Sequence, residues 1–199
     1  NDLWVNQGDG QLRNEAILSG TAFNRAGQRE AGMGSVVGDV DGDGRPDLFV
    51  TNFYGETNTL YRNEGAGFFL DVTDEFGLGS SSRLKLGFGT SLFDIDNDGW
   101  LDLFVTNGHV HDRPDVLGRV EPFAQRPQLF QNQDGQRFTD ITDSSGPYFR
   151  RHVVGRSCAV ADYDRDGWQD LAVGHLNSRL VLLHNQAGDT HAKSLQIQL

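Results

Sequence analysis

Short apolar runs separated by polar, glycine-rich turns extend along the whole chain. Three runs read Asp-Leu-Phe-Val-Thr at 47–51, Asp-Leu-Phe-Val-Thr at 102–106 and Asp-Leu-Ala-Val-Gly at 170–174. Continuous apolar runs of this length are typical of strands buried on both faces. Alternating apolar and polar residues at 69–74 and 138–143 instead predict half-buried strands. No segment has a helical period of useful length, so the pattern predicts an all-β chain.

The apolar runs belong to a larger repeat. Each run is preceded by another predicted strand, at 34–40, 89–95 and 157–163, and by an aspartate-rich loop. A Leu-x-x-Asn phrase recurs at 3–6, 60–63, 129–132 and 182–185. The glycine-containing turn after each Asn predicts a hairpin. Four short antiparallel strands repeated roughly every 55–68 residues are typical of β-propeller blades.

The repeats divide the chain into half a blade and three complete blades. The predicted boundaries are 1–20 for strands three and four of a preceding blade, and then 33–74, 87–143 and 155–199 for the complete blades. Propellers typically close with about 4–8 blades, and open blades leave strand edges that promote aggregation. We therefore expect the chain to be a fragment of a larger propeller or to pair with another chain.

One motif occupies the loop between the first two strands of each blade. It has Asp at positions one, three, five and nine and Gly at position six, in the loops 39–47, 94–102 and 162–170. Four carboxylates this close repel one another unless a cation lies among them. Ca²⁺ takes about 6–8 oxygen ligands, and Gly at position six permits the sharp turn that such a loop needs.

The motif predicts one structural Ca²⁺ site per loop, three in all, with the carboxylates and the backbone carbonyl of position seven as ligands. The predicted ligands are Asp39, Asp41, Asp43, Arg45 and Asp47; Asp94, Asp96, Asp98, Trp100 and Asp102; and Asp162, Asp164, Asp166, Trp168 and Asp170. An EF-hand is excluded because position twelve is Val50, Val105 or Val173 instead of a bidentate Glu. Mg²⁺ fits less well because it prefers strict octahedral geometry. Turns without a metal are the alternative.

Charge and cysteine content narrow the class of protein further. The net charge is −11, and 12 of the 28 acidic residues lie in the three loops. Three bound Ca²⁺ ions would change the net charge to about −5. A negatively charged chain is a poor partner for nucleic acid. The single Cys158 excludes an internal disulfide, and its apolar surroundings indicate a buried, inert thiol. No apolar run is long enough to span a membrane.

The loops at the other end of the blades are the predicted recognition surface. An insertion at 108–127 joins the second and third strands of one blade, and the connectors 21–33, 75–87 and 144–156 emerge at the same end. Loops on a rigid scaffold are where recognition usually occurs. The candidate ligand contacts are His109, His111, Arg113, Arg119, Arg126, Arg150, Arg151 and His152. Two of them, His109 and His111, could alternatively bind a transition metal or simply be solvated.

The Asp motif within a four-stranded repeat resembles the FG-GAP/VCBS repeats of integrin α-subunit propellers and of many secreted bacterial proteins. Leu-Tyr-Arg-Asn-Glu-Gly at 60–65, Asp-Val-Thr-Asp at 71–74 and Arg-Pro-Gln-Leu-Phe-Gln-Asn at 126–132 are similar to bacterial proteins of the ASPIC/UnbV type, which are relatives of cartilage acidic protein. This resemblance implies a Ca²⁺-stabilised propeller with an adhesion or matrix role. It also implies that residues 191–199 open a following domain.

Three functions are consistent with these features. The favoured one is a secreted or cell-surface (extracellular or periplasmic) binding, adhesion or scaffolding module that binds a protein or an anionic polysaccharide. A propeller lyase or hydrolase using connector His and Arg residues is the second, although no catalytic Ser-His-Asp or Cys-His spacing is evident. A structural subunit that associates through open blade edges is the third. We therefore expect a chain that is not an enzyme.

Overall fold

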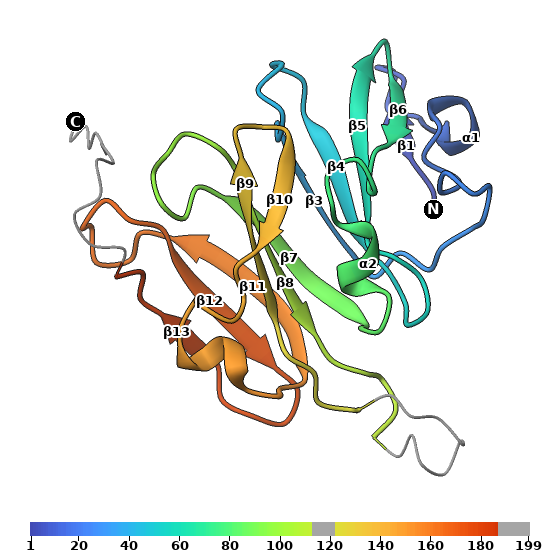
Figure 1. Cartoon of the computed structure of the whole chain (residues 1–199). Helices are drawn as coiled ribbons and strands as arrows, with labels where there is room; N and C mark the ends of the chain where they lie inside the picture. The colour runs from blue at the N-terminus through green and yellow to red at the C-terminus, as the bar shows by residue number, and fades with distance from the viewer. Residues whose placement is uncertain (113–121, 187–199) are drawn as a thin grey trace.

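The computed structural model describes residues 1–112 and 122–186, and its strands form four antiparallel sheets (Figure 1). The first sheet is a hairpin of β1 (Trp4–Asn6) and β2 (Leu12–Asn14). The second has the order β3 (Gly34–Gly38), β4 (Asp47–Thr51), β5 (Thr59–Gly65) and β6 (Phe68–Asp71).

The remaining two sheets repeat this order. The third contains β7 (Gly87–Phe93), β8 (Asp102–Asn107), β9 (Gln128–Gln133) and β10 (Arg137–Asp140). The fourth contains β11 (Gly155–Ala161), β12 (Asp170–His175) and β13 (Val181–Leu183). The expected end of the last blade, beyond residue 186, lies outside the described residues. The sheets confirm the predicted all-β architecture of antiparallel propeller blades, and we call the second, third and fourth sheets blades one, two and three.

Among residues 1–112 and 122–186, helical structure is limited to single turns. These are α1 (Ala16–Ser19), α2 (Gly79–Ser82) and the 3₁₀ turn η2 (Pro147–Arg150), all in connectors. Among the described residues, no helix has the length and apolar character needed to cross a membrane.

The second strand of each blade lies inside its sheet and is the most buried. Every residue of β8 is buried, and β4 has only one residue that is not. Each pairs with a strand on both sides, as where Leu103 lies opposite Leu92 of β7 and Phe130 of β9. In blade two, the continuous apolar run therefore corresponds to a strand that faces a neighbouring blade on each side.

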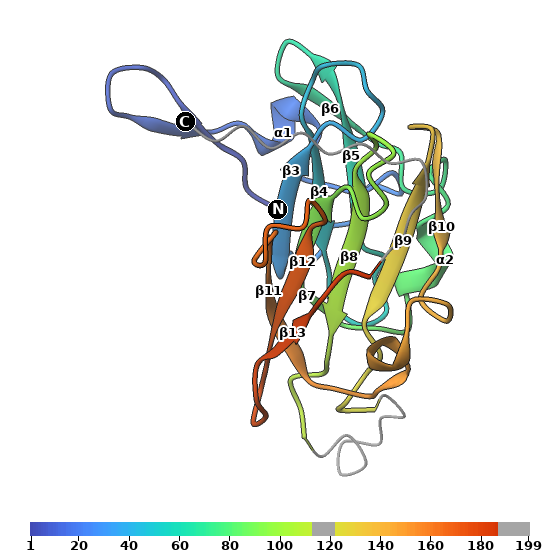
Figure 2. The same ribbon diagram turned by 90° about the vertical axis from the view of Figure 1, so that its left-hand side faces the viewer.

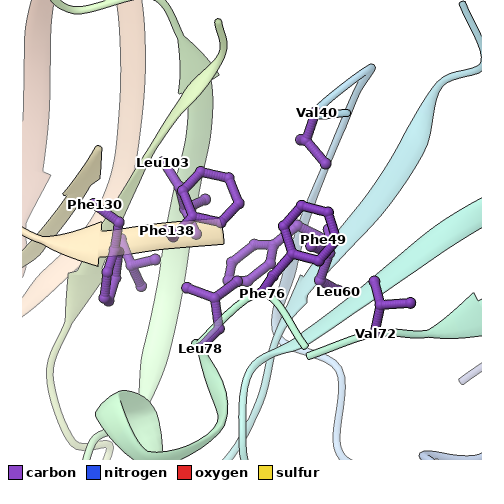
Figure 3. Close-up of a cluster of buried hydrophobic side chains, with 10 residues drawn as sticks. Val40, Phe49, Leu60, Val72, Phe76, Leu78, Leu103, Phe130 and Phe138 are labelled. Carbon is purple, nitrogen blue, oxygen red and sulfur yellow. The ribbon is translucent and has the colours of Figure 1, made fainter. Parts of the chain in front are cut away.

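The hydrophobic core consists of side chains that fill the spaces between blades. One cluster joins blades one and two, and Figure 3 shows Phe49 and Leu60 on one side and Leu103 and Phe130 on the other. A second cluster joins blades two and three and includes Phe104 of β8 and Val173 of β12. Full burial of a side chain of this kind contributes about 1.5–3 kcal/mol, so blade-to-blade packing is the main source of stability.

The first strands of the three blades, β3, β7 and β11, run along the same side of the molecule (Figure 2) and contact one another. Their approach leaves no space for some side chains. A Cβ atom on Gly34 would lie 2.2 Å from the Phe88 carbonyl oxygen, and one on Gly89 would lie 2.7 Å from Ser157 Cα. Glycine at these positions therefore allows adjacent blades to meet at their first strands.

Candidate metal centre

Each Asp loop folds around the carboxylate at its first position. Asp39 accepts hydrogen bonds from the backbone N–H groups of Gly42 and Gly44, both at 2.8 Å. Asp94 and Asp162 accept the corresponding bonds from Gly99 and Gly167, at 2.8 and 3.0 Å. Gly44, Gly99 and Gly167 have φ values of 83°, 96° and 94°. The glycine at position six is therefore required by a left-handed backbone that other residues adopt with strain.

The ninth-position aspartates are the most buried part of the site. Asp47, Asp102 and Asp170 are 0%, 0% and 1% exposed. Each accepts two backbone hydrogen bonds, and for Asp102 the donors are Ile95 at 2.9 Å and Asn132 at 2.7 Å. Burial raises the pKa of Asp102 to about 7, although these two bonds oppose the shift. Burial likewise raises the pKa of Asp47. Burial disfavours the charged form of such a carboxylate, and a neighbouring positive charge favours it.

Carboxylate oxygens converge in all three loops. Three groups have oxygens that all lie within 4.8 Å of one another: Asp39, Asp41 and Asp43; Asp94, Asp96 and Asp102; and Asp162, Asp164 and Asp170. In addition, Asp96 Oδ1 is buried without a hydrogen-bond donor among the described residues. An all-oxygen set with an unsatisfied buried acceptor fits a hard divalent cation such as Ca²⁺.

The seventh-position residues orient the fifth-position carboxylates. The N–H groups of Arg45, Trp100 and Trp168 donate to Asp43, Asp98 and Asp166 at 2.8, 2.8 and 2.9 Å. The Arg45 guanidinium also forms an ion pair with Asp43. Coordination by the three carbonyls at position seven stays a prediction.

The Trp100 side chain lies between two blades. A Cβ atom on Gly42, in the loop of blade one, would be 2.9 Å from Trp100 Cζ3. A Cβ atom on Gly135, in the β9–β10 hairpin, would be 2.5 Å from the same atom. The indole ring therefore fills the space between adjacent loops.

The repeated Asn of strand three has a role that the sequence reasoning missed. Its side chain crosses to the Asp loop of the preceding blade, because Asn132 Nδ2 donates to the Val40 carbonyl at 2.8 Å and Asn185 Nδ2 donates to the Ile95 carbonyl at 2.7 Å. Sequence reasoning used this Asn only as a hairpin signal. Its fourfold recurrence was the available sign that it does more than form a turn.

The residue before this Asn also reaches the loop of its own blade. Gln131 Nε2 donates to Asp96 Oδ2 at 2.6 Å. His184 Nε2 lies 3.0 Å from Asp164 Oδ2 and 3.4 Å from Asp166 Oδ2. Sequence reasoning overlooked His184, although it occupies the same position in the Leu-x-x-Asn phrase as Gln131.

The candidate ligand residues of the insertion do not form one surface. His109 is 0% exposed and packs against the rings of Phe53 and Tyr54, with centroid distances of 5.8 and 6.4 Å. His111 is exposed, and its N–H donates to His109 Nδ1 at 3.1 Å. Burial removes His109 from direct contact with a large partner. Arg113 and Arg119 lie outside the described residues.

The other basic candidates differ in the contacts that they make. Arg126 Nε donates to the Phe149 carbonyl at 2.9 Å, and its guanidinium forms an ion pair with Asp143. Arg150 donates to the Asp143 carbonyl at 3.3 Å. Arg126 therefore links the insertion to the β10–β11 connector, whereas the Arg150 bond lies within that connector. Arg151 and His152 are exposed at the surface.

A cleft of about 910 Å³ lies at the end of blade one opposite its Asp loop. The connector before β3, the β4–β5 connector and the β6–β7 connector all contribute to it. Arg25, Arg29 and Arg83 line it together with four acidic residues, Glu30, Glu56, Asp71 and Asp74. At this blade the predicted recognition surface is therefore a mixed-charge cleft, and no histidine of the described residues lines it.

The repeated blades and their acidic loops define a partial β-propeller. The chain belongs to the FG-GAP-like repeat family, whose model matches residues 1–50 and 39–105, more than half of the sequence. It is 35% identical over 99 residues to integrin alpha-3 of Cricetulus griseus and of Mus musculus, and 36% identical over 98 residues to integrin alpha-7 of Mus musculus.

These alignments cover 48% of the chain but only 9% and 8% of integrin alpha-3 and alpha-7, so the matched segment is a small part of those relatives. The similarity to ASPIC/UnbV proteins stays a prediction, and residues 191–199, on which it partly depends, lie outside the described residues.

Proposed function

We propose that this chain is a Ca²⁺-stabilised propeller segment that acts as a binding or adhesion module and not as an enzyme. The observation that carries the proposal is the separation of two ends in blade one. The Asp loop closes β3 and β4 at one end, and the cleft lies among the connectors at the other. The likeness to integrin α chains supports an adhesion role.

The proposed cations are structural. In each loop the carboxylates would hold one Ca²⁺, which supplies the positive charge that four neighbouring aspartates require. The chain's own contribution is to preorganise the donors, through the backbone bonds to Asp39 and Asp102 described above. The ninth-position Asp also accepts a hydrogen bond from a backbone N–H of strand three. A loop that holds a cation would therefore connect three strands of its blade.

The proposed recognition surface is the cleft with its adjoining connectors. Arg29 and Arg83 are exposed there, and neither forms an ion pair in the described structure. Exposed guanidinium groups donate well to carboxylate and sulfate oxygens. We therefore propose an anionic partner, either a polysaccharide or an acidic protein surface, met outside the cell, at the cell surface or in the periplasm.

Surface plasmon resonance tests the anionic partner directly. The Ca²⁺-loaded chain is passed over immobilised heparin and polygalacturonate at about 50 mM and about 200 mM salt. We expect binding that weakens at the higher salt concentration. Arg29→Glu/Arg83→Glu should weaken it at least about tenfold, because two attractive contacts become repulsive.

A double variant outside the cleft supplies the matched control. Arg13 and Arg137 are also exposed, and Arg13→Glu/Arg137→Glu changes the net charge by the same amount. Retained binding by this control would locate recognition at the cleft. Absence of binding to both polymers, or equal loss in the two double variants, would remove the polysaccharide proposal.

A further inference from the structure

The three Asp loops differ in the side chain that strand three directs toward them. In blade one this position is Arg62, which forms an ion pair with Glu64 at 2.7 Å. In blade two it is Gln131, whose amide nitrogen donates to Asp96. In blade three it is His184, and only this side chain offers a nitrogen lone pair to a metal ion.

His184 is positioned among the carboxylates of its loop. Its ring contacts Tyr163 edge to face, with centroids 5.9 Å apart, and its Nε2 faces Asp164 and Asp166. Blade three thus has two overlapping donor groups that share Asp164: the all-oxygen group with Asp162 and Asp170, and the mixed group with Asp166 and His184.

The donor spacing of the mixed group suits a small ion. Zn²⁺ forms bonds of about 2.0–2.1 Å to His nitrogen and carboxylate oxygen, so two donors lie about 3.4 Å apart at a tetrahedral angle and about 3.0 Å apart at a right angle. The distances from His184 Nε2 to its two carboxylate oxygens are 3.4 and 3.0 Å. The three donor atoms of the group all lie within 4.8 Å of one another, so they can surround such an ion.

We propose that the third Asp loop prefers a transition-metal ion of the Zn²⁺ class, bound through His184, Asp164 and Asp166, to the Ca²⁺ that its carboxylates would otherwise hold, whereas the first two loops select Ca²⁺. This inference rests on the proposed function, in which the loops hold divalent cations. Imidazole ligands favour Zn²⁺, Ni²⁺ and Cu²⁺, and Ca²⁺ takes oxygen ligands. One side-chain difference therefore gives one blade of the repeat a different metal preference.

Two exchange variants at equivalent positions test the proposal. His184→Gln gives blade three the side chain of blade two, and Gln131→His gives blade two the imidazole. Tag-free, chelator-stripped chain is titrated with Zn²⁺ and with Ca²⁺ by calorimetry, and with Co²⁺ by visible absorption. We expect His184→Gln to lower the Zn²⁺ affinity of one site at least about tenfold, since even an indirect supporting residue affects metal affinity by about 10–100-fold.

The other readouts separate this inference from the proposed function. In His184→Gln we expect the Co²⁺ spectrum to lose its nitrogen-ligand component, while Ca²⁺ binding at the first two loops is unchanged. In Gln131→His we expect a new Zn²⁺ site. If the chain binds Ca²⁺ but its Zn²⁺ and Co²⁺ responses do not depend on His184, this inference is wrong and the proposed function still stands. His184 would then form only an ion pair with the aspartates. Failure of all three loops to bind any of these cations would overturn the proposed function as well.

Discussion

Single carboxylates show most clearly how the fold controls charge. Asp102 and Glu30 are both buried, at opposite ends of the blades, and burial raises the pKa of each. Asp102 belongs to a converging acidic group, in which a cation can restore the charged form. Glu30 is held instead by neutral donors, namely Thr59 Oγ1 at 2.6 Å and the amides of Asn24 and Asn52, both at 2.9 Å.

Glu30 leads to a prediction about pH. Burial is the main cause of its raised pKa, so the folded state binds a proton more readily than the unfolded state. The contribution of Glu30 to the free energy of unfolding therefore falls as pH rises from the unfolded pKa to the folded one. Glu30→Gln removes this loss, so the variant should gain stability relative to the parent chain as pH rises above the ordinary Glu pKa of about 4.3.

Urea unfolding at several pH values measures this difference. Glu75→Gln, which removes an exposed carboxylate, is the matched control. The free energies of unfolding of Glu30→Gln and the parent chain are compared at each pH. If their difference is constant with pH, or changes in the opposite direction, the pKa of Glu30 is not raised by folding.

Cys158 gives a second prediction at this scale. Burial raises the pKa of its thiol, and Sγ lies 3.1 Å from Ser91 Oγ. Because the thiolate is the reactive form, labelling by Ellman's reagent near pH 8 should be at least about tenfold slower in the folded chain than in urea. Equal rates in the two states would show that the thiol is open to solvent.

At the scale of elements, the Asn side chain joins one blade to the next. Asn132→Ala leaves the Val40 and Leu101 carbonyls without their amide donor and the Gly135 N–H without its acceptor. Loss of these buried bonds should lower the free energy of unfolding by about 2–4 kcal/mol. Chemical denaturation at fixed Ca²⁺ concentration measures the loss.

Asn63 is the control for that variant. It makes the equivalent bonds within its own blade, to the Pro46 carbonyl and from the Gly65 N–H. In the described residues its amide has no hydrogen bond to another blade. Asn63→Ala should therefore cost about 1 kcal/mol less than Asn132→Ala, and equal losses would show that the bond between blades contributes little.

The strands were predictable from sequence because a local pattern determines them. The runs beginning at Asp47, Asp102 and Asp170 are buried second strands, as their apolar content indicates, and β4 begins and ends where the sequence predicted. First strands end two residues earlier than expected, at Gly38, Phe93 and Ala161, because each of these residues pairs with the first residue of the second strand. Two of them also begin two residues earlier than expected, at Gly87 and Gly155.

The contacts between blades were not predictable in the same way. The bond from Asn132 to Val40 spans 92 residues, and that from Asn185 to Ile95 spans 90. No local pattern encodes such a pairing. Burial of His109 likewise depends on Phe53 and Tyr54, which come from a different blade. Sequence reasoning therefore located the acidic loops but not the side chains that connect them.

At the scale of the whole molecule, two apolar layers and three acidic loops hold the blades together. The layers act at any Ca²⁺ concentration, whereas the loops contain carboxylates that repel one another without a cation. The separation of metal loops from the cleft in blade one also implies that cations support recognition indirectly, by keeping the connectors in place. Stability should therefore depend on Ca²⁺ even though the cleft contains none of the predicted Ca²⁺ ligands.

Thermal unfolding of the chelator-stripped chain, with and without Ca²⁺, tests this central claim most directly. At a free Ca²⁺ concentration about 100 times the Kd, each occupied site should add about 2.7 kcal/mol to the free energy of unfolding. We predict a Tm that rises with Ca²⁺, falls again with excess chelator and responds less to Mg²⁺. The same Tm with Ca²⁺ and with chelator would contradict the proposal that these loops are structural Ca²⁺ sites.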